Sequence, residues 1–174
     1  MIYKSFIIEK NISTIRENLV LIYGENIGIK DEIKREIKKK FKEFEILLFN
    51  QDEILKNPTL LFNEVINISL FEKGKIILVD QSSDKITKTI EEISQYLDGQ
   101  KIFLFAGILD KKSKLRNYFE KSNTFAIVPC YEDNLQTLKK IILDKLQGFK
   151  GLNTENINII IKNINSDRSK LYNE

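Results

Sequence analysis

The sequence predicts a doubly wound α/β fold with a mostly parallel, five-stranded sheet, followed by the start of a small helical domain. Short, mostly apolar runs recur up to Pro129, amphipathic stretches separate them, and only amphipathic stretches follow. Such continuous apolar runs are typical of strands buried on both faces of a parallel sheet. Strands that alternate with helices need right-handed crossovers, which place helices on both faces. We therefore expect an α/β domain over residues 1–130 and a helical domain over 131–174.

The expected strands are the apolar runs themselves. The first run is ended by Gly24 and should be a central strand, and the third carries Asp80 at its carboxyl end. The runs cover residues 19–23, 45–49, 75–80, 102–106 and 124–128.

Apolar residues spaced at helical intervals predict the helices. A helical stretch is also expected over residues 58–68, another over 157–164, and the unfinished start of a third over 166–174. The stripes comprise Ile29, Ile33, Ile37 and Phe41; Ile86, Ile90, Ile93 and Leu97; Leu115 and Phe119; and Leu135, Leu138, Ile142 and Leu146.

Polar residues ahead of two of these stripes are candidate helix starts. Ser82, Ser83 and Asp84 precede one stripe, and Asp110 is expected to open the helix that carries Leu115. Their side-chain oxygens are suited to accept hydrogen bonds from the free amides of a first helical turn.

Composition excludes several classes of site. The chain has one cysteine, Cys130, and no histidine among its 174 residues. An internal disulfide, a zinc site and a serine–histidine hydrolase are therefore excluded, and Cys130 is expected to be a packed side chain because no histidine can activate it. No apolar stretch reaches the roughly 20 residues that cross a bilayer, and the start lacks a secretory signal. We expect a cytoplasmic protein without membrane contact.

Basic residues gather in the stretch 30–42, although the formal net charge is only +3. So small a charge does not by itself indicate nucleic-acid binding, and the stretch is interpreted first as a solvated helix face. The alternative is DNA contact, together with Lys111, Lys112, Lys114 and Arg116. Arg116 is not expected to be an arginine finger, because its sequence context lacks the pattern that accompanies one.

The loop after the first strand is where a doubly wound fold holds a phosphate. A phosphate loop reads G-x-x-x-x-G-K-[ST], in which glycine amides wrap the phosphates, the lysine neutralises them and the hydroxyl binds magnesium. Gly24 and Lys30 fit this pattern. Ile29 stands in place of the second glycine, and Asp31 in place of the hydroxyl. The phosphate loop is therefore degenerate.

The third expected strand carries the other half of such a site. Asp80 fits the acid that binds magnesium, but Gln81 cannot accept a proton from the attacking water. Defects in both halves of one site predict that nucleotide hydrolysis is absent, with no catalytic residue, metal or cofactor. The alternative interpretation is an ordinary strand–helix turn and a strand-ending aspartate.

Several short segments, taken in their order and spacing, carry a resemblance to one family. They are residues 21–25, 68–71, 75–79, 109–115 and 167–174. In these segments the chain resembles the delta subunit of the bacterial DNA polymerase III clamp loader, over essentially its whole length. The resemblance implies an AAA+-like first domain without a working phosphate loop, and a helical second domain. It also implies a third, collar domain that this chain lacks, so that we expect a fragment.

The resemblance also implies a function in DNA replication. The delta subunit binds and opens the sliding clamp for loading onto primed DNA, while other loader subunits hydrolyse ATP. Implied partners are the sliding clamp, the other loader subunits through the missing C-terminal part, and primer–template DNA within the full complex. The chain would then have no catalysis of its own, although it belongs to a DNA-directed DNA polymerase holoenzyme, a transferase.

The family's clamp-contacting tip falls on Ile68, Ser69, Leu70 and Phe71. On a helix that begins near residue 60, Leu70 projects away from the face that carries Ile68, and Phe71 lies off that face as well. An exposed Leu–Phe pair is suited to an apolar pocket on a partner. The alternative is that the helix ends at Ile68 and the pair packs beneath the third strand.

The sequence has features that can be compared with three other classes of protein. The chief alternative is a nucleotide-binding, P-loop-like enzyme with a divergent phosphate loop. A response-regulator domain needs clustered carboxylates after the first strand, where Tyr23 and Gly24 offer none. The loader's delta-prime subunit typically carries zinc-binding cysteines, which a single cysteine cannot supply.

Overall fold

The computed structural model describes residues 1–67, 74–164, 168 and 170. Within them, five strands form one sheet in the order β2-β3-β4-β1-β5, and all neighbouring strands are parallel. The strands are β1 (Leu19–Tyr23), β2 (Glu45–Asn50), β3 (Lys75–Ser82), β4 (Lys101–Ala106) and β5 (Ala126–Pro129). Each overlaps a predicted strand, so the predicted parallel α/β sheet is confirmed.

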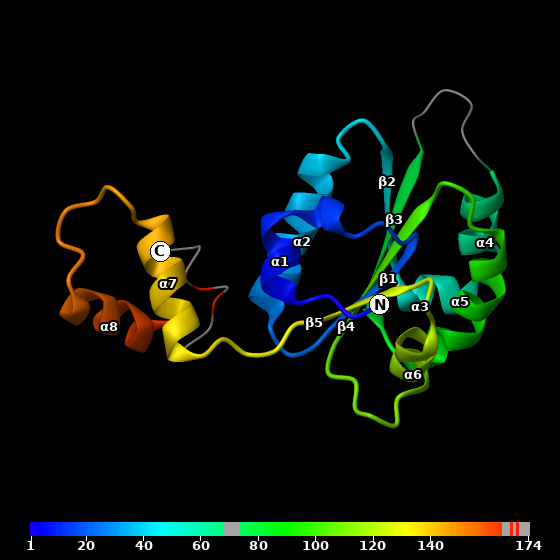
Figure 1. Ribbon diagram of the computed structural model, residues 1–174. Coiled ribbons are helices and arrows are strands. Elements are labelled where there is room, and N and C mark those ends of the chain that lie inside the picture. Colours follow the sequence, from blue (N-terminus) through cyan, green and yellow to red (C-terminus); the bar gives the residue numbers. More distant parts are fainter. Residues whose placement is uncertain (68–73, 165–167, 169, 171–174) are drawn as a thin grey trace.

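Helices cover both faces of this sheet (Figure 1). Helices α1 and α2 pack on one face and α3 to α6 on the other, while α7 and α8 lie beyond the β5 end. The helices are α1 (Ser5–Lys10), α2 (Ile27–Lys40), α3 (Gln51–Lys56), α4 (Pro58–Ile66), α5 (Thr87–Ile93), α6 (Lys114–Lys121), α7 (Leu135–Lys145) and α8 (Thr154–Asn163), with 3-10 turns at Ile12–Thr14, Asp84–Ile86 and Ser94–Tyr96.

Strand β1 lies at the centre of the hydrophobic core. All of its residues are buried, as predicted for a run that is apolar at every position. Leu19 and Leu21 pack with the helices of one face, whereas Val20 and Ile22 pack with α1 and α2 on the other. Successive side chains of a strand point to opposite faces, so one short strand joins both halves of the core.

The structure corrects one predicted helix start and confirms the other. Helix α6 begins at Lys114, where the Ser113 hydroxyl accepts from the Arg116 amide at 3.2 Å, so Asp110 does not open it. Ser83 is the cap of the 3-10 turn before α5, and its hydroxyl accepts from the Lys85 amide at 3.5 Å. Asp84 lies inside this turn, and its carboxylate accepts from the Ser113 hydroxyl at 2.5 Å and from the Leu115 amide at 3.1 Å. Burial would raise the pKa of Asp84, but these hydrogen bonds hold that pKa below its usual value. Asp84 therefore ties α5 to α6.

Helices α1 and α3 were not predicted, because each has only 6 residues and shows little more than one turn of periodicity. A capping box marks the start of α3: the Asn50 side chain accepts from the Asp52 amide, and Glu53 accepts from the Asn50 amide at 2.8 Å. This S/T/N-x-x-E pattern is the local signal that identifies the helix.

Helices α7 and α8 share a hydrophobic cluster of their own. It is built from Leu138, Ile142, Ile157, Ile161 and Ile164. Leu135, expected in the same stripe, is instead 60% exposed because it stands at the first helical position. The helix expected over residues 166–174 falls outside the described residues except at Arg168 and Lys170. Among the helices described, none is long and apolar enough to cross a membrane.

The turn after β1 approaches the end of β5 closely. Gly24 has a φ of +132°, and a Cβ placed on it would lie 2.2 Å from the carbonyl oxygen of Cys130. Both the backbone angle and the contact require glycine at this position. The Gly24 amide donates to the Gly107 carbonyl at 3.0 Å, which also fixes the turn against β4.

We expect Gly24→Ala to lower the free energy of unfolding by more than about 2 kcal/mol, since the added methyl combines a left-handed φ with a backbone clash. Chemical denaturation monitored by circular dichroism measures the change. Gly107→Ala is the matched control, because nothing lies within 4 Å of its Cβ position, and it should change stability by less than about 0.5 kcal/mol. Equal effects of the two substitutions would contradict this account of the turn.

Candidate functional site

The degenerate nucleotide site predicted from the sequence lies at the carboxyl edge of the sheet. Only residues 24–26 separate the end of β1 at Tyr23 from the start of α2 at Ile27. Ile29, which stands in place of the second glycine of a phosphate loop, is inside the first turn of α2 and only 3% exposed. The backbone therefore turns directly into the helix and forms no loop of the length that encloses phosphates.

The amides at the start of α2 are bound within the protein. The Asn26 side chain accepts from the Ile29 amide at 3.1 Å, and the Asn26 amide donates to the Cys130 carbonyl at 3.1 Å. A helix amino-terminus attracts anions because its first amides lack partners. Here Asn26 supplies a partner from the chain itself. An asparagine just before an apolar stripe is a cap signal that sequence reasoning missed.

Lys30, the residue in the position of the phosphate-loop lysine, is turned toward the ends of two strands. Its ammonium group donates to the carbonyls of Gly24 at 2.8 Å and of Ala106 at 3.0 Å. Burial lowers the pKa of this half-buried lysine below its usual value. The structure thus brings Gly24 and Lys30 together, as the motif would, but the Lys30 ammonium is bound to backbone oxygens of its own chain. Asp31 is exposed on the outer surface of α2.

Asp80 and Gln81, the other half of the predicted site, contact different partners. The Asp80 carboxylate pairs with the Lys34 ammonium at 2.6 Å, and Lys34 also lies 4.7 Å from the centroid of the Phe105 ring. The Gln81 side chain accepts from the Asn50 amide group at 3.0 Å, and its φ is +56°. Asp80 is therefore neutralised by a lysine of α2. In the part of the chain that the structure describes, no group of three or more acidic, cysteine or histidine side chains is arranged to hold a metal ion.

Two further candidate residues, Cys130 and Arg116, are held within the protein. Cys130 is fully buried, and burial raises the pKa of its thiol to about 12, in keeping with a packed side chain. Arg116 donates to Glu120 at 2.8 Å and to the Leu109 carbonyl at 3.1 Å, and its guanidinium lies 5.1 Å from the centroid of the Tyr23 ring. These contacts hold Arg116 against its own domain.

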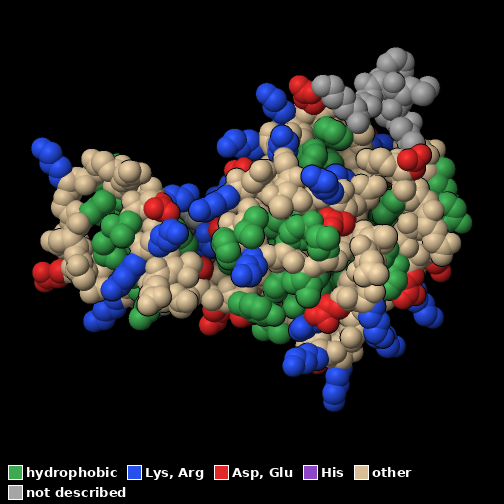
Figure 2. Space-filling view, viewed as in Figure 1, with side chains coloured by type: hydrophobic (Ala, Val, Ile, Leu, Met, Phe, Trp, Pro, Cys, Tyr) green, Lys and Arg blue, Asp and Glu red, His purple; other side chains and the backbone are tan. Residues whose placement is uncertain are grey.

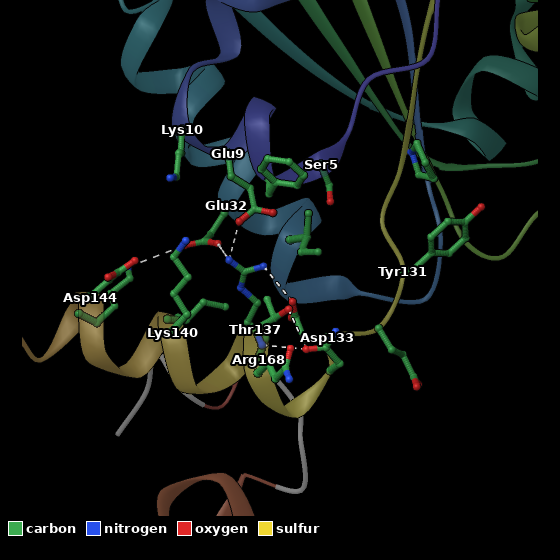
Figure 3. A pocket seen from close by; sticks show the side chains of 18 residues that line it. Ser5, Glu9, Lys10, Glu32, Tyr131, Asp133, Thr137, Lys140, Asp144 and Arg168 are labelled. Carbon is green, nitrogen blue, oxygen red and sulfur yellow. Dashed lines mark hydrogen bonds and ion pairs between the residues drawn. The ribbon is translucent and has the colours of Figure 1, made fainter. Parts of the chain in front are cut away.

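A pocket of about 680 Å³ lies between α1, α2 and α7 (Figure 3). Arg168 reaches into it and is paired with carboxylates of Glu9, Glu32 and Asp133. Sequence reasoning did not find this cluster, because its members stand at widely separated positions and no spacing pattern connects them. Burial raises the pKa of Glu9, although its contact with Arg168 acts in the opposite direction.

The predicted clamp-contacting residues Ile68, Ser69, Leu70 and Phe71 lie outside the described residues. The flanking residues are held firmly. The Gln100 side chain donates to the Val65 carbonyl at 2.8 Å, and the buried Lys75 pairs with Glu64 at 2.7 Å. Strand β3 begins at Lys75 and ends at Ser82, so Asp80 and Gln81 lie at the opposite end of this strand from Lys75.

No protein-family model and no curated protein matches the sequence. Solved structures with a similar fold do exist. The Bacillus subtilis DNA clamp loader delta protein (YqeN) matches with a TM-score of 0.64 and 14% identity, covering 97% of this chain and 55% of that protein. Domain III of the Thermotoga maritima replication initiation protein DnaA matches with a TM-score of 0.51 and 16% identity, covering 96% of this chain and 76% of that one. Rhizobiales Trip13 matches with a TM-score of 0.52 and 14% identity, covering 91% and 65%.

These similarities concern the fold, because the identities are low. The chain spans about half the length of the delta protein that it matches. Its all-parallel, five-stranded sheet with flanking helices is the AAA+-like α/β fold that the sequence predicts.

Proposed function

We propose that this chain is a clamp-loader subunit of the delta type, which binds the sliding clamp during DNA replication and does not hydrolyse ATP. Two observations together support the proposal. The fold is similar to that of the delta protein over 97% of this chain. At the position of the phosphate loop, Asn26 caps α2 and Lys30 binds a backbone carbonyl of the same chain. Such a domain has the fold of an ATPase but no site for the nucleotide. Its function is then binding rather than catalysis.

The proposed contact with the clamp is made by Leu70 and Phe71, with Ile68 and Ser69 beside them. Burial of one such apolar side chain in a partner's pocket contributes about 1.5–3 kcal/mol, so the pair has the energy of an anchor. On either side of this segment, the Lys75–Glu64 ion pair joins β3 to α4, and the Gln100 side chain donates to the Val65 carbonyl of α4. The anchor can open the clamp only as far as it binds the open form more tightly than the closed one.

The remaining features of a delta subunit belong to the same proposal. Residues 131–174 correspond to the start of the helical second domain, of which α7 and α8 are described. Assembly with other loader subunits and contact with primer–template DNA are proposed for the complete subunit, since this chain spans only 55% of the delta protein. We place this function in the cytoplasm, within a polymerase holoenzyme.

Calorimetric titration with ATP and magnesium is expected to give no binding heat. The amino-terminus of α2 is capped by Asn26, Lys30 is bound to two carbonyls, and Asp80 is paired with Lys34. Lys30→Met should give the same flat titration and serves as the control. A binding isotherm in the unmodified protein that Lys30→Met abolishes would favour the alternative, a nucleotide-binding P-loop-like enzyme.

Leu70→Ala combined with Phe71→Ala should weaken binding to the sliding clamp of the same organism by more than about 100-fold, because two anchors are lost. Surface plasmon resonance measures the affinity, and thermal unfolding of the double variant should match that of the unmodified protein.

The matched control replaces another leucine and phenylalanine, Leu135 and Phe149, which are 60% and 70% exposed and do not belong to the proposed clamp-binding segment. Leu135→Ala with Phe149→Ala should leave clamp affinity unchanged. If the Leu70/Phe71 variant unfolds, these two residues belong to the hydrophobic core. If it binds the clamp with unchanged affinity, they do not anchor the clamp.

A further inference from the structure

Arg168 occupies an unusual position between two parts of the molecule. Its guanidinium lies 2.5 Å from Glu9 of α1, 2.8 Å from Glu32 of α2 and 3.6 Å from Asp133, which follows β5 (Figure 3). The Arg168 side chain is only 6% exposed, and that of Asp133 only 4%. Guanidinium has five donors in a planar fork and remains charged, so it is suited to hold several carboxylates at once.

Arg168 joins the three carboxylates of this cluster. Its guanidinium is paired with Glu9, Glu32 and Asp133, whereas the ion pairs of Lys145 at 3.7 Å and of Arg35 at 3.9 Å are with Glu32. Burial raises the pKa of Glu9, which is the effect expected for a carboxylate that is desolvated among other carboxylates. The cluster therefore depends on Arg168, because without it three acidic side chains would remain close together in a largely dry place.

A second set of contacts continues from Arg168 to the start of α2. Asp133 approaches Arg168 through one carboxylate oxygen and accepts from the Asn26 side chain at 2.8 Å through the other. Asn26 also donates to the Tyr131 carbonyl at 3.1 Å and caps α2 through the Ile29 amide. The polar chain thus leads without a break from the amino-terminus of α2, where a phosphate is held in nucleotide-binding folds, to Arg168.

The buried hydrophobic clusters formed by the described residues do not join the α7–α8 pair to the sheet. The cluster beneath α7 and α8 contains only residues from 138 to 164, and the two clusters on the sheet end at Cys130. Between them lies the pocket of about 680 Å³, and the surface narrows at the same place (Figure 2). Among the residues that the structure describes, ion pairs and hydrogen bonds are thus the main link between the α7–α8 pair and the sheet.

We propose that Arg168, with Glu9, Glu32 and Asp133, forms a latch that fixes the α7–α8 pair to the sheet domain without any nucleotide. In this latch, the Asp133 carboxylate accepts from Asn26 and pairs with Arg168, so it takes the role of an anionic ligand between the start of α2 and Arg168. The latch therefore keeps the α7–α8 pair in one arrangement relative to the sheet without a ligand, whereas in many enzymes the closure of one part onto another depends on ligand binding. This inference does not depend on clamp binding.

The test compares the tumbling of the two parts by ¹⁵N relaxation in the complete chain without nucleotide. In the unmodified protein, amides of α7 and α8 should have the same rotational correlation time as those of β1 and β4. In the Arg168→Gln variant, the α7 and α8 amides should show a shorter correlation time, while the sheet amides retain their resonance positions. Lys162→Gln is the matched control, because it removes an exposed positive charge from α8 and should change neither value.

Equal correlation times for both parts in Arg168→Gln would overturn the latch. Independent tumbling in the unmodified protein, or a change of its relaxation upon addition of ATP and magnesium, would also overturn it. If Arg168→Gln shifts the isoleucine methyl resonances of α7 and α8 to random-coil positions, Asp133→Asn decides by the same measurement, since Asp133 lies outside that cluster. Faster tumbling of α7 and α8 in Asp133→Asn then supports the latch, and unchanged tumbling rejects it.

Discussion

The close approach of the turn after β1 to the end of β5 is the constraint on which the candidate site depends. The Cys130 amide donates to the Tyr23 carbonyl at 2.7 Å, and the Asn26 amide donates back to the Cys130 carbonyl at 3.1 Å. Two backbones this close leave no room for a side chain at Gly24. The turn is therefore short, and α2 begins beside Tyr131 and Asp133, which both accept from Asn26.

This short turn explains why the polar groups of the site are satisfied by the chain itself. The partial positive charge at the start of α2 is met by the Asn26 cap, and the ammonium of Lys30 by two carbonyl oxygens. An external phosphate would have to displace these internal partners and carry its own desolvation cost. The site is thus closed by hydrogen bonds already made, as well as by the residue changes visible in the motif.

The polar contacts at the two edges of the sheet join different elements. At the carboxyl edge, polar contacts of Asp80, Lys30 and Arg168 join neighbouring elements to one another. At the amino edge, Lys75 and Gln100 hold the residues on either side of the proposed clamp-binding segment. Strand β3 connects the two edges directly. Asp80 and Gln81 of the degenerate nucleotide site and the proposed clamp-binding segment therefore belong to opposite ends of β3 in the sequence.

The sequence by itself determined the strands, most helices and the defects in the nucleotide motif, because these depend on local apolar periodicity and on residue identity. It did not reveal α1 or α3, each too short for its period to be seen. Only the tertiary structure decided which groups Asp84 and Lys30 bind, and that Arg168 meets Glu9 from 159 positions away. Parallel strands with crossover connections bring distant segments to one edge, so the partners of a charged side chain there follow from the packing of the chain and not from its local sequence.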